Sequence, residues 1–109
     1  MIVRRSPHFQ STSHTAQVQK AVLLENGEVP RVTQFATSVF APNSKVESHV
    51  HEDMYESFFV QYGRIWVKVD GVEYEFCAGD SFTIFPNERH EMGNSASEEA
   101  ALIYFGALA

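Results

Sequence analysis

The sequence contains little cysteine and little positive charge. Cys77 is the single cysteine among 109 residues, which excludes an intramolecular disulfide and is typical of proteins from a reducing compartment. Eight Lys and Arg residues against 14 Asp and Glu residues give a formal net charge of -6. Because binding to nucleic acid requires clustered basic side chains that contact phosphates, we expect no nucleic-acid partner.

The sequence also has no long apolar run. No segment approaches the roughly 18 consecutive apolar residues that a membrane-spanning helix needs, so we expect no membrane association. The amino-terminal stretch MIVRRSPHFQSTSH carries two arginines but no apolar segment after them, unlike a secretory signal. Neither a GxGxxG pattern nor a P-loop is present, so no nucleotide cofactor is indicated. We therefore expect a cytoplasmic protein.

Aromatic residues, in contrast, are abundant. They make up 13% of the chain and include nine Phe, a load that suits a β-rich protein better than a small helical one. A chain of this length has room for one hydrophobic core. Residues 1–17 are polar and predict an amino-terminal arm or loop, and residues 18–109 predict a single β-barrel domain.

Period-two hydrophobic patterns recur along residues 18–109 and predict strands. The clearest is a hairpin in which Ile65, Val67 and Val69 alternate with polar residues, and in which Asp70-Gly71 forms a two-residue turn. The second hairpin strand is expected to point Val72, Tyr74 and Phe76 inward. We predict an all-β fold of about eight or nine short antiparallel strands with little or no helix. Further strand candidates cover residues 18–24, 31–40, 81–85 and 99–105.

Two histidines and a glutamate lie close together in the stretch HVHEDMYE. His49 and His51 would share one face of a strand, but strict alternation would put Glu56 on the other face. For Glu56 to join the histidines, the chain must bend at residues 52–54, where two acidic residues disfavour a continuous strand. A second block, GDSFTIFPNERHEMGN, adds His90, which would share a face with Met92 and Asn94.

These two blocks resemble the two conserved motifs of the cupin superfamily of small β-barrels. The first motif, G-x5-HxH-x3-4-E-x6-G, is met from residue 43 to residue 63. The second, G-x5-PxG-x2-H-x3-N, is met from Gly79 to Asn94. Three positions depart from the motifs: Asn43 and Asn87 replace glycines, and Phe85 replaces proline. Asn is the non-glycine residue that best tolerates positive φ, and Pro86 follows Phe85 directly.

The resemblance implies a double-stranded β-helix, or jelly-roll barrel, and one divalent metal in its mouth. It assigns four metal ligands: His49, His51, Glu56 and His90. A mixed set of imidazoles and a carboxylate suits Fe, Mn, Zn, Ni or Co, and the absence of thiolates disfavours a structural zinc site. The alternative is a barrel that keeps the fold but has lost the metal. Asn94 is expected to hold a turn and not to bind metal.

Other residues are candidates for the wall of a pocket or for catalysis. Glu56 and Tyr55 are the catalytic candidates, although alternation turns Tyr55 away from Glu56. Core packing explains each wall candidate equally well, and the pocket they would form is apolar or aromatic. This favours a small neutral or aromatic ligand over a polyanion. The candidates for the pocket wall are Phe58, Phe82, Met92 and Tyr104.

The resemblance does not name a reaction, because many functions share one fold. We expect a small metalloenzyme of the dioxygenase or the isomerase/lyase type that acts on a small organic molecule. The alternative is a module that binds or senses a small molecule without catalysis. Small cupins commonly pair, so the resemblance also implies a homodimer.

Overall fold

The computed structural model describes residues 1–5, 8–12 and 16–109, and these residues form strands but no helix. The all-β prediction is confirmed. The described part of the chain therefore also contains no helix that could cross a membrane. The strands are β1 (Gln10–Ser11), β2 (Val18–Leu24), β3 (Val32–Phe40), β4 (Ser44–His49), β5 (Met54–Tyr62), β6 (Arg64–Val69), β7 (Val72–Cys77), β8 (Ser81–Ile84), β9 (His90–Asn94) and β10 (Ala100–Leu108).

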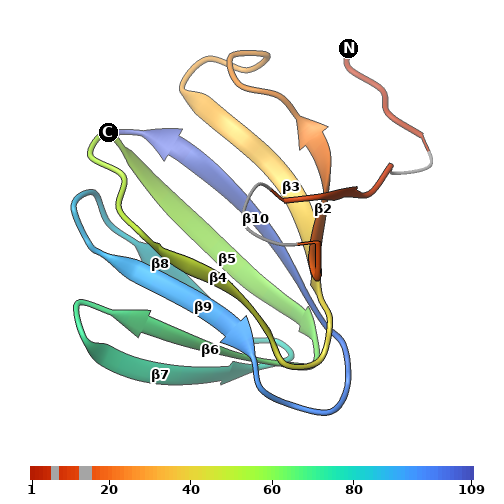
Figure 1. Cartoon of the computed structure of the whole chain (residues 1–109). Helices are drawn as coiled ribbons and strands as arrows, with labels where there is room; N and C mark the ends of the chain where they lie inside the picture. The colour runs from red at the N-terminus through yellow and green to blue at the C-terminus, as the bar shows by residue number, and fades with distance from the viewer. Residues whose placement is uncertain (6–7, 13–15) are drawn as a thin grey trace.

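The strands form two antiparallel sheets that face each other (Figure 1). The first sheet has the order β1-β2-β3-β10-β5-β8, and the second has the order β4-β9-β6-β7. The chain crosses repeatedly from one sheet to the other, as in a jelly roll. The strand count exceeds the expected eight or nine because the polar arm contributes β1, which pairs with β2.

The predicted hairpin is present as β6 and β7. Asp70 and Gly71 both have positive φ, 47° and 85°, as a primed two-residue turn requires. The expected inward side of β7 is only partly buried, however: Val72 and Tyr74 are exposed. The reason is that β7 is an edge strand of its sheet, so among the described strands only β6 pairs with it.

The barrel has two unlike ends. At one end, the connections 50–53 and 85–89 meet, and the Asn87 backbone N–H donates to the His51 carbonyl oxygen at 2.7 Å. At the other end, the Asn94 side chain donates to the carbonyl oxygens of Phe40 and Glu98. Its own oxygen accepts a bond from the backbone N–H of Ala96. The expectation that Asn94 holds a turn is thus confirmed, and this second end is closed by hydrogen bonds.

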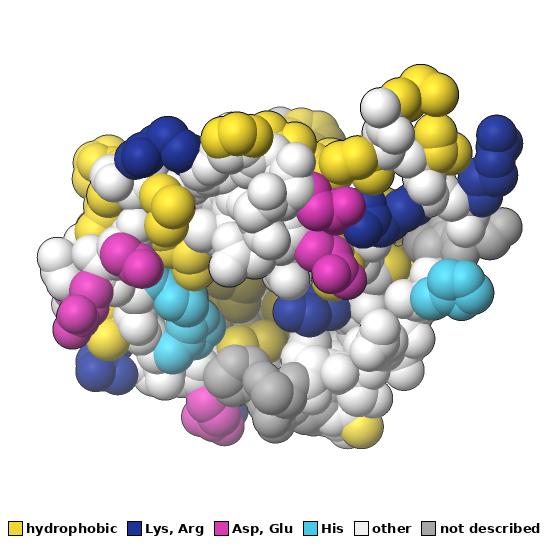
Figure 2. Space-filling model, turned by 90° about the horizontal axis from the view of Figure 1, so that it is seen from above, with side chains coloured by type: hydrophobic (Ala, Val, Ile, Leu, Met, Phe, Trp, Pro, Cys, Tyr) yellow, Lys and Arg dark blue, Asp and Glu magenta, His cyan; other side chains and the backbone are white. Residues whose placement is uncertain are grey.

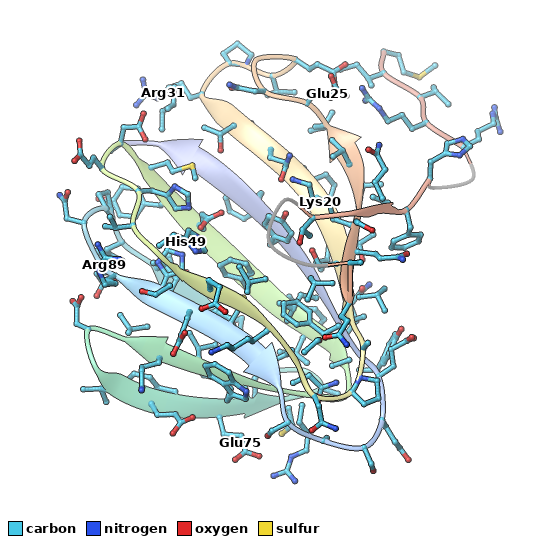
Figure 3. All side chains as sticks on the ribbon, in the orientation of Figure 1. Lys20, Glu25, Arg31, His49, Glu75 and Arg89 are labelled. Atoms are coloured by element: carbon cyan, nitrogen blue, oxygen red, sulfur yellow. The ribbon has the colours of Figure 1, made fainter. Side chains whose placement is uncertain are left out.

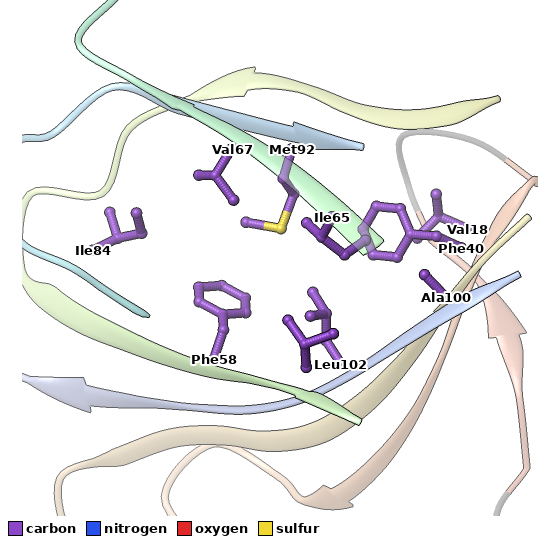
Figure 4. Packing of buried hydrophobic residues seen from close by; sticks show 10 residues of the cluster. Val18, Phe40, Phe58, Ile65, Val67, Ile84, Met92, Ala100 and Leu102 are labelled. Carbon is purple, nitrogen blue, oxygen red and sulfur yellow. The ribbon is translucent and has the colours of Figure 1, made fainter. Parts of the chain in front are cut away.

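The core lies between the two sheets, nearer the closed end. Figure 4 shows Met92 of β9 and Phe58 of β5 pointing toward each other across this space. Val60 and Ile65 are fully buried, and Leu102 is nearly so. This packing fixes the spacing of the sheets, and therefore the width of the opposite, open end.

Candidate metal centre

Four side chains from both sheets converge at the open end of the barrel. His49 is the last residue of β4, and it pairs in register with His90, the first residue of β9. His51 follows His49 in the connection to β5. Glu56 is the third residue of β5, on the facing sheet. The bend at Glu52 and Asp53 therefore carries the chain from one sheet to the other, which is why the spacing of Glu56 does not fit a single strand.

The four groups are close enough to bind one ion. One ligand atom from each of the four residues lies within 4.8 Å of all the others. Glu56 Oε1 is 3.3 Å from His51 Nε2 and 3.5 Å from His90 Nε2. With metal–ligand bonds of roughly 2.0–2.2 Å, atoms at these separations can share a single divalent cation.

The backbone orients two of the histidines for metal binding. His49 Nδ1 is 2.9 Å from the Glu47 carbonyl oxygen, and His90 Nδ1 is 2.9 Å from the Glu88 carbonyl oxygen. A carbonyl can only accept, so each neutral ring carries its proton on Nδ1. That tautomer leaves the Nε2 lone pair free, and outer hydrogen bonds of this kind are typical of histidines that bind metal.

Two atoms of the cluster are buried without a hydrogen-bond partner: Glu56 Oε1 and His90 Nε2. They approach each other but do not form a well-aligned hydrogen bond. Buried polar atoms normally find a partner, because leaving one unsatisfied costs about 1–3 kcal/mol. A cation bound between these atoms satisfies both. The residues present therefore fit a metal ion.

The pKa values of half-buried His49 and buried His90 shift in opposite directions. Burial lowers the pKa of His49, and the neighbouring His90 and His51 act in the same direction. Burial would also lower the pKa of His90, but the Glu56 carboxylate and the Glu88 carbonyl oxygen outweigh it and raise that pKa. In the absence of metal, a proton on His90 thus partly offsets the charge of Glu56.

Comparison with known families identifies the fold and its motifs. The family model described as Cupin domain matches residues 36–106, which include both motifs and all four residues of the cluster. The chain belongs to the cupin family. Among curated proteins, none matches it.

Solved structures agree with this cupin assignment. A predicted oxalate decarboxylase from Thermotoga maritima superposes with a TM-score of 0.87, 23% identity and full coverage of both chains. The cupin domain of Cnp3 from Schizosaccharomyces pombe has a TM-score of 0.83 and 18% identity, covering 95% of this chain and 70% of that one. The cupin domain of an XRE family transcriptional regulator from Enterobacter cloacae has a TM-score of 0.75 and 17% identity, covering 84% and 96%. At these identities the likeness concerns the fold.

The departures from the cupin motifs have a structural explanation. Asn43 and Asn87, which replace motif glycines, have φ values of 57° and 69°. Asn tolerates this left-handed region better than most residues, because its short polar side chain can bond locally. Both substitutions therefore preserve the backbone turn that the cupin motif requires.

One cavity is lined by three of the four candidate ligands, all except His90, and by three of the four expected wall residues: Phe58, Met92 and Tyr104. Phe82 does not line it. Its ring stacks on Phe58 with centroids 4.9 Å apart, and its far side faces a second hollow, near β7. The catalytic candidate Tyr55 also lies outside the cavity, exposed and in edge contact with Phe85. Alternation along β5 explains this, since Glu56 points inward and its neighbour outward.

The polar part of this cavity was not predicted from the sequence. Lys20, Gln34 and Ser38 line it together with the metal-site histidines. The expectation of apolar or aromatic walls is thus incomplete. A usable signal existed, because alternation from the buried Val18 places Lys20 on the inner face of its strand.

Proposed function

We propose that this cupin binds one divalent transition metal through His49, His51, Glu56 and His90 and acts as a small metalloenzyme on a small organic molecule. The observation that carries the proposal is the pair of buried, unsatisfied atoms, Glu56 Oε1 and His90 Nε2. They belong to a cluster whose other members, His49 and His51, line a cavity of about 250 Å³ together with Glu56. A structural site would be closed by the protein, whereas this cluster opens into a cavity that can admit a ligand.

A metal at this site would supply Lewis-acid activation of an oxygen or redox chemistry with dioxygen. The chain's own residues would accept a proton and limit the access of water. Glu56 is the one carboxylate of the cluster and can hold a proton released by the substrate. Met92, Phe58 and Leu102 form an apolar wall that limits water around the reacting atoms. The family contains both dioxygenases and isomerases or lyases, and the choice between them depends on the metal.

The reaction class can be tested by metal analysis followed by activity assays. Protein purified without chelator should carry a transition metal, and its identity directs the next step. With Fe(II), oxygen uptake is measured with small catechols, thiols and diketones. If activity is supported only by Zn(II), which is redox-inert, the dioxygenase branch is wrong. Protein that binds less than about a tenth of an equivalent of any of these metals after reconstitution would contradict the whole proposal.

The second candidate is a module that binds or senses a small molecule. It is supported by the cavity beside the candidate ligands and by the likeness to the cupin domain of a transcriptional regulator. A bound small molecule that is recovered unchanged after long incubation with metal-loaded protein would favour this candidate over the enzyme.

Metal affinity is expected to fall steeply as the pH drops below about 7. Histidine binds metal only when neutral, and the Glu56 carboxylate raises the pKa of His90 above its ordinary value of about 6.5. Each proton that the metal must displace weakens binding by about tenfold per pH unit below that pKa. Competition with a chelator between pH 5.5 and 8 measures the effect. An affinity that stays constant over this range contradicts histidine ligation.

Without metal, the two shifted histidines act in opposite directions on stability. The raised pKa of His90 contributes stability that is present below pH 6.5 and is lost as the pH rises through its folded-state pKa. The lowered pKa of His49 contributes stability that is present above pH 6.5 and is lost as the pH falls through its folded-state pKa. We therefore expect the metal-free protein to show a shallower pH dependence in urea unfolding than the metal-loaded protein.

We also propose that two copies pair through the outer face of the first sheet. Phe59 and Phe105 are each 45% exposed on this face, and none of the outward residues of β5 and β10 carries a charge. Since each copy has a formal charge of -6, a neutral apolar face is where self-association meets least repulsion. Light scattering should give about twice the 12.3 kDa chain mass. Phe105→Glu should halve that mass, whereas Val72→Glu on the other sheet should not.

A further inference from the structure

Three polar side chains lie in the metal-site cavity without touching the metal ligands. Lys20 Nζ donates to Gln34 Oε1 at 3.3 Å, and Tyr104 Oη donates to the same oxygen at 3.0 Å. The three residues come from β2, β3 and β10, which are adjacent in the first sheet. All three line the cavity that His49, His51 and Glu56 also line.

The cavity therefore has two chemically different sides. Lys20 projects from β2 of one sheet, and His49 lies at the end of β4 on the other (Figure 3). Figure 2 shows the hollow from above, with histidines on one side, a Lys or Arg side chain on the other, and a hydrophobic floor between them. The floor and walls that connect the two sides are formed by Val18, Phe40, Val46, Met54, Phe58, Met92 and Leu102.

Lys20 has no counter-ion within the described residues. Its ammonium group contacts the neutral amide of Gln34 and forms no ion pair with a carboxylate. Most long charged side chains extend into water, and placing one in a partly buried cavity has a desolvation cost unless it is paired. In a chain with 14 acidic residues and eight basic ones, a cation held beside a metal site without a carboxylate partner is suited to an incoming anion.

Gln34 is arranged to support this role. An ammonium group only donates, so the atom of Gln34 that faces Lys20 must be its carbonyl oxygen. The oxygen accepts from both Lys20 and Tyr104, and this fixes the orientation of the amide. Its NH₂ group has no acceptor among the described residues. Burial and, to a smaller extent, the negative charge of Glu56 raise the pKa of Tyr104, whereas a hydrogen bond with Ser38 lowers it. The net effect is a raised pKa, so the phenol keeps its proton and remains a hydrogen-bond donor.

We propose that Lys20, Gln34 and Tyr104 form an anion subsite, and that the ligand of this cupin is a small organic acid. The carboxylate of the acid binds at the Lys20 side, and an oxygen at its other end faces the metal ligands. This inference rests on the proposed function and adds to it the chemical class of the substrate. A volume of about 250 Å³ equals about eight water molecules at roughly 30 Å³ each. It therefore admits a compact acid, and the single cation matches a single negative charge.

The test compares benzoate with benzamide, which have the same shape but differ in charge. Binding is measured by calorimetry at pH 8 on chelator-treated and on Zn(II)-loaded protein. We expect chelator-treated wild-type protein to bind benzoate at least about tenfold more tightly than benzamide, as for a charge-assisted hydrogen bond. Raising the salt concentration should weaken benzoate binding and leave benzamide binding unchanged.

Variants of Lys20 and Lys68 show whether the preference for benzoate depends on Lys20. Lys20→Met keeps the length and the apolar part of the side chain, and it should reduce the preference for benzoate to less than about twofold. Lys68→Met is the matched control. Lys68 is exposed on β6, so this substitution removes the same charge outside the cavity. If Lys20→Met does not fold, Lys20→Gln tests the same charge.

The outcomes separate the subsite from the metal function. An unchanged preference in a folded Lys20 variant, or no preference in the wild type, overturns the anion subsite even when metal binds fully. A preference that depends on Lys20 in protein that never takes up metal supports the subsite and overturns the metalloenzyme. Inorganic phosphate that binds more tightly than benzoate would overturn the assignment to organic acids.

Discussion

A His90→Ala variant is expected to bind divalent transition metal at least about 100-fold more weakly than the wild type and to carry almost none after purification. Loss of an outer-shell partner of a metal site costs about 10- to 100-fold, and His90 is a direct ligand in our assignment. It is also the most deeply buried of the four, with 1% of its surface exposed, so water replaces it poorly. Mass spectrometry measures the metal content of the purified variant, and chelator competition measures its metal affinity.

A matched control distinguishes ligation from a general loss of histidine. His8→Ala removes an exposed histidine from the arm and should leave metal content unchanged. Urea unfolding of the metal-free His90→Ala variant shows whether the barrel still forms. If a folded His90→Ala variant binds metal as tightly as the wild type, the four-residue site is wrong.

A Gly63→Ala variant is expected to lose at least about 3 kcal/mol of unfolding free energy. Gly63 joins β5 to β6 at the closed end of the barrel and has a φ of 79°. A Cβ atom there would lie 2.6 Å from Ala100 Cα and 2.7 Å from the Glu99 carbonyl oxygen. These contacts are with backbone, which cannot move aside as a flexible side chain can, so the end of β5 would have to move away from the start of β10, its neighbour in the sheet.

A Gly71→Ala variant separates the cost of backbone strain from the cost of the steric clash. Gly71 has a similar φ of 85°, but a Cβ atom there would meet no atom within 4 Å. The control should therefore cost only the backbone strain, about 1–2 kcal/mol, and the difference between the variants measures the steric clash. Equal losses in urea unfolding would show that Gly63 is required only for its φ and not for close packing at the closed end.

Much of the site could be predicted from the sequence because its residues are held in short local patterns. Alternation placed Phe58 and Met92 inward, and the spacing of Glu56 indicated the bend before β5. The same reasoning was wrong for Val72 and Tyr74, since alternation states which side of a strand a residue occupies but not whether another strand covers that side. Phe82 illustrates the same difficulty: it packs on Phe58 but faces a different hollow.

The sequence by itself determined the all-β class, the family resemblance and the four candidate metal ligands. Each of these depends on residue type and on separation along a few strands, which the period of two makes regular. Only the tertiary structure decided what faces those ligands. The pairing of β2, β3 and β10 places Lys20, Gln34 and Tyr104 in the same cavity, although up to 84 residues separate them along the chain (104 − 20). Contacts between strands so distant in sequence depend on sheet order and register, and these arise from packing of the whole core.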